Sequence, residues 1–319
     1  MRVLVTGSTG LIGRQVLQDL GRQGITGVPV VRTSGGTLHA GQVGARVIPD
    51  IGPGTDWGAA LDGIEAVVHL AAQVHDMAAE RSGRTAAYHE VNALGTERLA
   101  AAAARAGVRR FVFVSSIKAM GEGRPQPWTA ADEPRPMDTY GQSKLEGERR
   151  LLAVASGSGM ESVIVRPPLV YGPGVKANFL AMMRWLSRGW PLPLGSVDGR
   201  RSLISVWNLS ALLVRCLEHP NARGEIFLAS DGQDLTIPEL LQSLGHAMDK
   251  PIRLIDVPRP LLQLATRLPR LGPVVSRLTE NLLIDPSRTF NRLDWVPPLS
   301  VAEGLTRTVR WFNSEGFQA

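Results

Sequence analysis

Two residues, Tyr140 and Lys144, are spaced so that they could share proton chemistry. In the string Tyr140-Gly141-Gln142-Ser143-Lys144 the two side chains are four residues apart, so on a helix they lie on one face, one turn apart. A phenol titrates near about pH 10, but a neighbouring ammonium favours the phenolate and should lower the pKa of Tyr140. Tyr140 could then donate or accept a proton near neutral pH. Ordinary exposed polar pairs share this spacing, so the rest of the chain must decide between the two interpretations.

A glycine-rich turn near the N-terminus has the features of a phosphate site. The apolar pattern of residues 2–6 predicts a buried strand, and residues 14–22 are predicted to form a helix. Between them lies Gly7-Ser8-Thr9-Gly10-Leu11-Ile12-Gly13. Glycines allow a close approach to the backbone, and a helix N-terminus presents free N–H groups. The spacing G-x-x-G-x-x-G departs from the standard G-x-G-x-x-G fingerprint, and a plain strand-to-helix turn is the alternative. We expect a dinucleotide at Gly7, Gly10, Leu11, Ile12 and Gly13.

The end of the second strand bears on the choice of cofactor. Residues 27–31 form this strand, and Arg32 follows where NAD-binding folds commonly place an acidic residue for the ribose 2′-hydroxyl. An arginine suits a 2′-phosphate through paired, charge-assisted hydrogen bonds. The sequence therefore favours NADP(H), with NAD(H) possible if Arg32 is only solvated or stacks on the adenine.

The remaining strand ends predict the architecture. Strands at residues 46–49, 65–70, 109–116 and 162–165 alternate with helices, which predicts right-handed βαβ units in a doubly wound parallel Rossmann sheet of the α/β class. Ligands of such sheets bind at the carboxyl ends of the strands. The residues expected at that edge are Gly7, Asp50, Ile51, Leu70, Ala71, Ala72, Ser116, Tyr140 and Pro167. For the two alanines alone, tight packing explains the small side chains equally well.

Two regions are expected along the chain. Residues 1–170 form the dinucleotide-binding Rossmann domain, and residues 171–319 mainly form a smaller substrate-binding lobe, with some segments returning to the sheet. Residues 121–136 are rich in proline and glycine, so we expect a loop there that covers another part of the protein. Residues 258–278 carry leucines beside arginines; packing on the lobe is favoured, and a position on a membrane surface is the alternative.

Composition excludes several classes of protein. The net charge is +6 and the pI about 10.1, but no basic run has interleaved aromatics, which argues against a nucleic-acid partner. Anionic small molecules or a solvated surface account for the charge. Cys216 is the single cysteine, so no internal disulfide can form, and no Cys/His cluster has metal-ligand spacing. Because no targeting segment or long apolar run is present, we expect a cytoplasmic protein without an integral membrane segment.

Taken together, these residues resemble the extended short-chain dehydrogenase/reductases, the NAD-dependent epimerase/dehydratase family that acts on nucleotide sugars. The resemblance spans nearly the whole chain. Its motifs are Thr6-Gly7-x-x-Gly10-x-x-Gly13, Leu70-Ala71-Ala72, Val91-Asn92-Ala93-Leu94-Gly95-Thr96, Ser115-Ser116, Tyr140-x-x-x-Lys144 and Arg166-Pro167-Pro168-x-x-Tyr171-Gly172.

The resemblance implies roles for particular residues. Ser116 would bind the sugar oxygen at the reacting carbon, Tyr140 would pass the proton, and Lys144 would hold the nicotinamide ribose and tune Tyr140. Asn178 and Arg201 match positions that contact the diphosphate of a UDP-sugar substrate, although a surface ion pair is the alternative for Arg201. The resemblance also implies a homodimer through the long helices.

Departures from the family pattern argue against some of the activities found in the family. The stretch 116–121 lacks the Thr-Asp-Glu triplet of 4,6-dehydratases, which argues against dehydration, and Met120 departs from the Val-Tyr-Gly of epimerases. The strings 115–118, 174–179 and 191–195 resemble the branch of 4-keto-sugar reductases that make UDP-N-acetylquinovosamine. We therefore expect an NAD(P)H-dependent oxidoreductase, a reductase of a 4-keto nucleotide sugar in polysaccharide precursor synthesis. The alternatives are a UDP-hexose 4-epimerase with bound NAD and a non-catalytic nucleotide-binding sensor.

Overall fold

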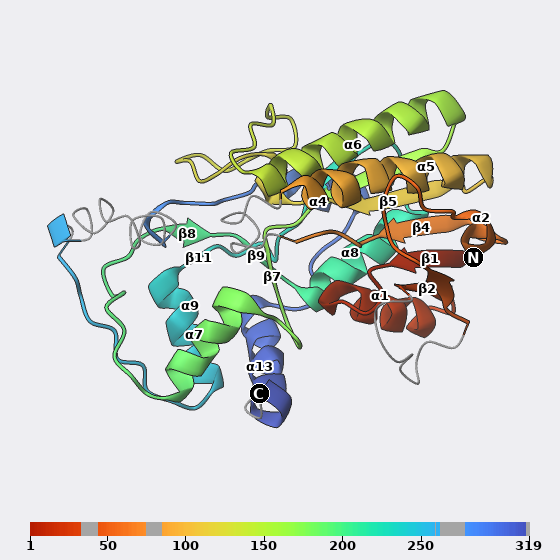
Figure 1. Ribbon diagram of the computed structural model, residues 1–319. Helices are drawn as coiled ribbons and strands as arrows, with labels where there is room; N and C mark the ends of the chain where they lie inside the picture. Colours follow the sequence, from red (N-terminus) through yellow and green to blue (C-terminus); the bar gives the residue numbers. More distant parts are fainter. Residues whose placement is uncertain (33–43, 75–84, 259, 262–277, 317–319) are drawn as a thin grey trace.

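A seven-stranded parallel sheet forms the centre of the molecule (Figure 1). The computed structural model describes residues 1–319 except 33–43, 75–84, 259, 262–277 and 317–319. Along the sheet the strands follow the order β10-β6-β5-β4-β1-β2-β3, and every adjacent pair is parallel. Their bounds are β1 Arg2–Thr6, β2 Thr26–Arg32, β3 Arg46–Ile48, β4 Ala66–His69, β5 Arg110–Val114, β6 Glu161–Arg166 and β10 Ile226–Leu228.

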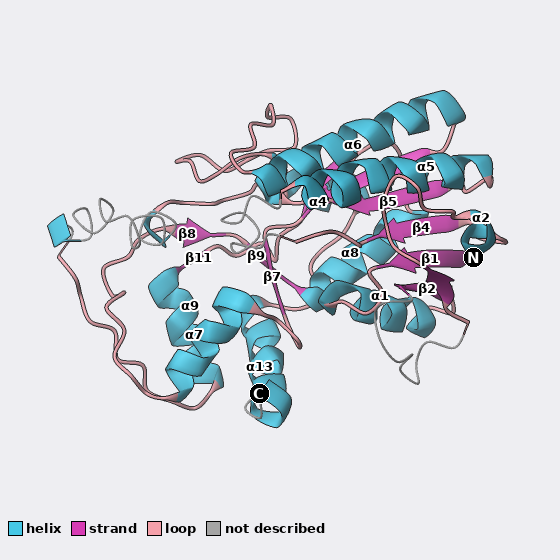
Figure 2. Ribbon diagram, in the orientation of Figure 1, coloured by secondary structure: helices cyan, strands magenta, loops and turns pink. Residues whose placement is uncertain are grey.

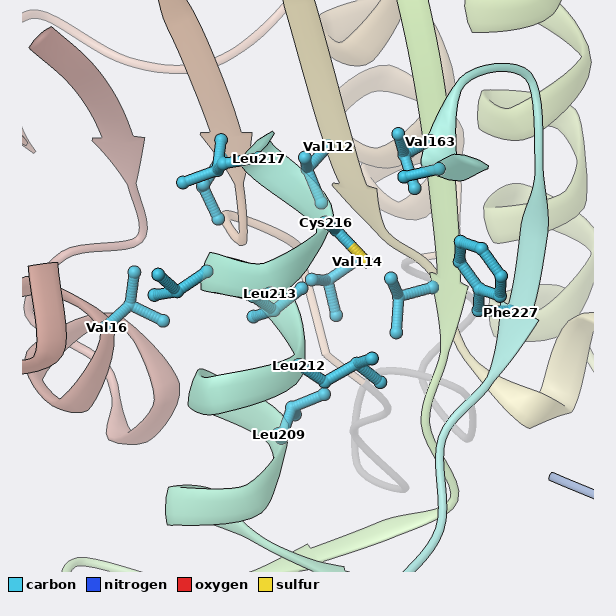
Figure 3. Close-up of a cluster of buried hydrophobic side chains, with 14 of the residues drawn as sticks. Val16, Val112, Val114, Val163, Leu209, Leu212, Leu213, Cys216, Leu217 and Phe227 are labelled. Atoms are coloured by element: carbon cyan, nitrogen blue, oxygen red, sulfur yellow. The ribbon is translucent and has the colours of Figure 1, made fainter. Parts of the chain in front are cut away.

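Helices cover both faces of this sheet, as Figure 2 shows, so the fold is the predicted doubly wound α/β arrangement. One face carries α1 (Leu11–Arg22) and α8 (Val206–Glu218), which pack on the apolar side chains of β1, β4, β5 and β6. Figure 3 shows the row Leu209, Leu212, Leu213 and Leu217 of α8 directed at Val112, Val114 and Val163 of the sheet. This spacing of three and four residues is that of one helix face.

The opposite face is covered by α2 (Gly58–Leu61), α5 (Gly95–Arg105) and α6 (Thr139–Ser158). Residues 86–105 form a continuous helical run in three parts, because a π-helical segment, η2 (His89–Leu94), separates α4 (Ala86–Tyr88) from α5. Leu99, Ala100 and Ala103 of α5 are fully buried against the sheet, so the alanine-rich sequence serves close helix–sheet packing. A short 3-10 helix, η3 (Ile117–Ala119), follows β5.

The C-terminal half builds a second apolar core and also contributes to the sheet. That core is enclosed by α7 (Ala177–Ser187), α9 (Ile237–Ala247) and α13 (Val301–Trp311). Two small sheets accompany it, one pairing β7 (Leu169–Tyr171) with β9 (Leu203–Ser205), the other β8 (Arg200–Arg201) with β11 (Leu235–Thr236). The strand β10 returns to pair with β6, and the described residues also form η4 (Pro220–Ala222), α12 (Ser287–Leu293) and η5 (Phe312–Gly316).

Two earlier expectations concern membranes. In the part of the chain that the structure describes, no helix is long and apolar enough to cross a bilayer. Most of the amphipathic stretch at residues 258–278 lies outside the described residues, namely 259 and 262–277.

Candidate active site

A pocket of about 360 Å³ opens at the carboxyl ends of β1, β2 and β4, the edge where the sheet topology predicts a ligand. It lies where the chain order reverses between β1 and β4. All eleven residues expected to bind the cofactor from these strand ends line it: Gly7, Gly10, Leu11, Ile12, Gly13, Arg32, Asp50, Ile51, Leu70, Ala71 and Ala72. The pocket also includes residues to which the sequence gave no binding role: Thr9, Val30, Val31, Gln73, Val74 and Val91.

The turn between β1 and α1 is shaped to accept a phosphate. Gly7 has φ +66°, and a Cβ there would lie 2.9 Å from the backbone N of Ala71, so a side chain would collide with the neighbouring strand end. Gly10 caps α1 without a side-chain hydrogen bond to the first turn. The first amides of α1 therefore keep their donors for a ligand, and the turn fits the pyrophosphate of a dinucleotide.

A chain of buried hydrogen bonds holds this turn in place, and it fixes the tautomer of His69. The Thr6 hydroxyl accepts from the amides of Leu70 and Ala71, each at 3.1 Å, and lies 2.7 Å from His69 Nδ1. With both lone pairs used, the hydroxyl must donate to Nδ1, so the proton of His69 is on Nε2. Burial and the nearby Lys144 lower the pKa of His69 to about 3, which keeps the ring neutral.

The same chain of hydrogen bonds continues to α6, the helix that carries Tyr140 and Lys144. His69 Nε2 lies 3.1 Å from the Thr96 hydroxyl, which in turn donates to the carbonyl of Asn92 at 2.8 Å. The Asn92 amide donates to Ser143 Oγ on α6 at 3.0 Å and pairs with both backbone groups of Gln73. The strand ends of the nucleotide pocket and the helix of Tyr140 are thus joined by one continuous set of hydrogen bonds.

We expect Thr6→Val to weaken both the fold and the pocket. The valine keeps the shape but leaves the amides of Leu70 and Ala71 and the His69 ring without their partner, and each buried unpaired group costs about 1 to 3 kcal/mol. Chemical denaturation should show the lower free energy of unfolding, and titration should show weaker nicotinamide dinucleotide binding. Thr26→Val, on an exposed residue at the start of β2, is the control; if it matched Thr6→Val in both measurements, the role given to Thr6 would be wrong.

Arg32 and Asp50 lie beside one another in the lining of the pocket. The closest approach of guanidinium and carboxylate is 3.5 Å, and both side chains are more than half exposed. The residue that could attract a 2′-phosphate therefore already has an acidic neighbour. Because the pair is exposed, its strength is small and a ligand can displace it.

Tyr140 and Ser116 meet at the end of β5. Tyr140 is the second residue of α6, Ser116 precedes η3, and their side chains are hydrogen-bonded. The carbonyl of Pro167, after β6, accepts from the amide of Ile117 at 2.9 Å, which places Pro167 beside Ser116. The three predicted residues from β5, α6 and β6 are therefore close together, as the sheet-edge argument requires.

The expected effect of Lys144 on Tyr140 is not what the structure shows. Desolvation by burial is the main cause that raises the pKa of Tyr140 to about 12; the hydrogen bond from Ser116 opposes the shift, and the nearby Asp138 and Tyr88 add to it. The prediction of a lowered pKa was wrong because it counted one ammonium and ignored burial of the phenol. Tyr140 is thus protonated at neutral pH and suited to donate a proton.

Lys144 is itself unusual. Its side chain is 1% exposed, and the ammonium lies 4.1 Å from the centre of the Phe113 ring. Burial lowers the pKa of Lys144 to about 7, and Glu148, one turn further along α6, opposes that shift. Lys144 therefore changes charge near neutral pH, which makes it a better candidate for tuning chemistry than a permanently charged residue.

Close packing sets the position of α6. A Cβ at Gly141 would lie 2.3 Å from the carbonyl oxygen of Lys118, so only glycine lets α6 come this close to the segment that carries Ser116. The α6 N-cap, Asp138, accepts from the Gly141 amide at 2.6 Å and also faces the Lys118 ammonium at 3.4 Å. Lys118 pairs with Glu122 as well. The stretch 116–121 contains no carboxylate of its own, but Glu122 and Asp138 bring two carboxylates next to it.

The two residues expected to contact the substrate diphosphate lie on the C-terminal lobe. Asn178 is exposed at the start of α7, directly after Ala177, whose φ of +52° is unusual for a residue with a side chain. Arg201 lies on β8 and is partly exposed. Their binding roles stay predictions. Within the described residues, no group of three or more His, Cys, Asp or Glu could hold a metal ion.

Known proteins with related sequences and folds agree with this geometry. A UDP-glucose 4-epimerase from Vibrio cholerae is 41% identical over 97% of this chain and 95% of its own length. A ceramide reductase from Caulobacter vibrioides is 27% identical over 99% of this chain and 95% of its length. The crystal structure of a UDP-glucose 4-epimerase from Thermotoga maritima with UDP-glucose has a TM-score of 0.78, at 24% identity, over 98% of this chain and 99% of that one.

These findings identify the family. The structural likeness confirms the fold, and the sequence relative spans essentially the whole chain. In addition, the family model described as "NAD dependent epimerase/dehydratase family" matches residues 3–229, which include the phosphate turn, Ser116, Tyr140 and Lys144. The chain therefore belongs to the NAD-dependent epimerase/dehydratase family.

Proposed function

We propose that this protein is a UDP-hexose 4-epimerase that keeps NAD bound. The geometric observation that carries the proposal is the hydrogen bond between Tyr140 and Ser116 beside the buried Lys144, because these groups can exchange a proton with a sugar hydroxyl. The choice of an epimerase is favoured by the 41% identical relative from Vibrio cholerae, described as a UDP-glucose 4-epimerase.

Each step of the proposed epimerisation is assigned to particular residues. The Gly7 turn and the pocket lining as far as Asp50 would hold NAD, which would supply reversible hydride exchange when bound. Ser116 orients the 4-oxygen of the sugar by a hydrogen bond. Tyr140 is protonated in the empty site, so it must first release its own proton to solvent; as the phenolate it then takes the proton of the sugar oxygen and later returns it. Lys144 sits one turn from Tyr140 and, when charged, favours the phenolate. Because the proton is taken and returned, the same residues serve both halves of an epimerisation.

A reductase of a 4-keto nucleotide sugar is the second candidate, and a specific observation favours it. The strand β2 ends at Arg32, and the pocket has no carboxylate at that strand end, which suits a phosphorylated and exchangeable cofactor. The string Ser115-Ser116-Ile117-Lys118, similar to the reductase branch, points the same way. Asp50, only 3.5 Å from Arg32, weighs against it.

One experiment separates these functions. The purified protein is incubated with UDP-galactose and with UDP-N-acetylgalactosamine, without added cofactor, and products are identified by NMR. A parallel reaction contains a UDP-4-keto-6-deoxy sugar, made by a dehydratase, with NADH or NADPH. Epimers formed without net cofactor use support the proposal. Consumption of one cofactor per ketone, with no epimers, would establish the reductase instead, and nucleotide binding without any turnover would indicate a sensor.

The Arg32 side chain gives a prediction about cofactor preference. If Arg32 leaves Asp50 to bind a 2′-phosphate, NADPH should be preferred over NADH by roughly tenfold to a hundredfold, because charge-assisted hydrogen bonds contribute about 1.5 to 3 kcal/mol. Arg32→Asp should then reverse the preference by adding a repulsive charge. Dissociation constants for both cofactors, in wild type and variant, decide the point.

The opposite result would be equally informative. Equal or tighter binding of NADH by the wild type would show that Arg32 does not hold a 2′-phosphate, and it would strengthen the epimerase proposal. Arg22→Asp, on an exposed arginine of α1 outside the pocket, controls for the change in net charge.

A homodimer through the long helices α5 and α6 also stays a proposal, to be checked by light scattering on the eluting protein.

A further inference from the structure

Lys118 of η3 contacts both segments that carry the hydroxyl groups of the candidate active site, and no step of the proposed reaction uses it. Its backbone amide donates to the Ser116 hydroxyl at 3.2 Å. Its carbonyl oxygen lies against Gly141, the residue after Tyr140, where a Cβ would come within 2.3 Å of that oxygen. The backbone of Lys118 therefore fixes η3 against the start of α6, with Ser116 on one side and Tyr140 on the other.

The ammonium of Lys118 bridges two carboxylates from different segments. It pairs with Glu122 and lies 3.4 Å from Oδ2 of Asp138, the N-cap of α6. Oδ1 of Asp138 accepts from the Gly141 amide at 2.6 Å, whereas Oδ2 is buried and accepts no hydrogen bond within the described part of the chain. The ammonium therefore offsets the charge on that buried oxygen. The two side chains are 25% and 18% exposed, so salt screens this pair less than a pair at the open surface.

The charge of Asp138 bears on the chemistry because Tyr140 lies two residues further along α6. Burial is the main cause of the raised pKa of Tyr140; the hydrogen bond from Ser116 opposes the shift, and Asp138 and Tyr88 add to it. Lys144 lies one turn further along the same helix face. Charged or titratable side chains on other elements packed against α6 are exposed or paired: His89 and Glu90 of η2, Glu97 of α5 with Arg150, and Arg166 of β6 with Glu148.

We propose that Lys118 is a positioning residue of the candidate active site, whose ammonium holds Asp138 in place and offsets the charge that this carboxylate directs at Tyr140. The proposal deepens the proposed function and rests on it, because the charge matters to the reaction when Tyr140 exchanges a proton. Lys118 acts through Asp138. Without the ammonium, the carboxylate would disfavour the phenolate that has to take the proton of the sugar oxygen.

Titration of the phenol tests this role without any substrate. The chain has three tyrosines, so the ultraviolet absorbance of phenolate can be assigned to Tyr140 by comparing each protein with the same protein carrying Tyr140→Phe. The titration is read at an alkaline pH at which circular dichroism still shows the fold. There Lys118→Met should form roughly threefold to tenfold less phenolate at Tyr140 than the wild type, because an uncompensated charge nearby shifts a pKa by about one unit. Lys118→Arg should match the wild type, and Asp138→Asn should form more phenolate.

Turnover of UDP-galactose gives the matching kinetic result. In Lys118→Met kcat should fall roughly threefold to tenfold while KM stays within about twofold, because Lys118 acts on the proton transfer and not on substrate binding. Lys118→Met/Asp138→Asn removes the carboxylate charge, keeps a good N-cap and should recover the wild-type kcat. Arg124→Met is the matched control, because it breaks an ion pair with Asp132 in the following loop at 30% and 29% exposure. It should change neither the titration nor the turnover.

Three results would overturn the role of Lys118: an unchanged titration of Tyr140 in Lys118→Met, no recovery on adding Asp138→Asn, or equal impairment of Arg124→Met. A change confined to KM would also overturn it, because it would indicate contact with the substrate. If the wild type did not turn over UDP-galactose, the epimerase proposal would fail by itself. The order of the phenol titrations would still decide the role of Lys118.

Discussion

Tyr140→Phe should lower turnover by about two to four powers of ten, the usual contribution of a general acid or base. The change removes one oxygen, and with it the hydrogen bond to Ser116 and the proton that a sugar oxygen would exchange. The free energy of unfolding and the affinity for dinucleotide should stay close to the wild-type values, because the ring still packs against Tyr88, 6.1 Å away. Single-turnover kinetics would show whether the chemical step is the one affected.

The neighbouring tyrosine provides the matched control. Tyr88→Phe removes a phenol oxygen from a buried ring next to Tyr140, outside the proposed proton transfer. It should lose far less turnover than Tyr140→Phe. If Tyr140→Phe kept more than half of the wild-type turnover, or if the two variants were equally impaired, proton transfer by Tyr140 would be refuted and a packing role would explain the result.

The places of the candidate residues in the fold could be predicted from the sequence, because they rest on local patterns. Gly7 and the first residues of α1 are recognisable from the strand, turn and helix that contain them. Tyr140 and Lys144 are recognisable from helical spacing. Once the alternation of strands and helices indicated a parallel sheet, the topology alone placed Ser116 and Pro167 at the same edge. The fold and the outline of the pocket follow from such local signals.

What the sequence could not show are the groups that support the site from a distance. Thr6 and His69 are 63 residues apart, and Asn92 and Ser143 are 51 apart. Threonine, histidine and asparagine each have many ordinary uses, so nothing marks them as partners before the fold is known. The pKa of Tyr140 is raised and not lowered for the same reason. A spacing of four residues reveals the neighbouring ammonium, but it does not reveal the burial of the phenol.

A buried ion pair beneath Lys144 is the most consequential of these distant contacts. Glu148 on α6 and Arg166 at the end of β6 are each 2% exposed at the side chain, and the guanidinium nitrogen Nε lies 2.9 Å from Oε1. A second bond joins the other carboxylate oxygen to the same guanidinium. With Tyr140, Lys144 and Glu148 spaced at four-residue intervals, one face of α6 carries the proton donor, its ammonium and the carboxylate that stabilises that ammonium.

Glu148→Gln should lower the free energy of unfolding by about 3 to 5 kcal/mol, because it leaves the Arg166 charge buried without its partner. It should also lower the pKa of Lys144 below its present value of about 7, since Glu148 now favours the charged ammonium. If charged Lys144 supports the reaction, the alkaline limb of the kcat profile must move to lower pH in the variant. Denaturation and a pH–rate profile measure the two effects separately.

The helix supplies the control for this change. Glu146→Gln removes the same charge two residues away, but Glu146 is a third exposed at its side chain and pairs with Arg150 at the surface, so the loss should be only about 0 to 1 kcal/mol. In the double variant Glu148→Leu/Arg166→Met no charge is left unpaired, and much of the stability should return. The alkaline limb should nevertheless stay displaced, because the carboxylate near Lys144 is still missing. If the limb returned together with the stability, Glu148 would serve packing alone and would not set the charge of Lys144.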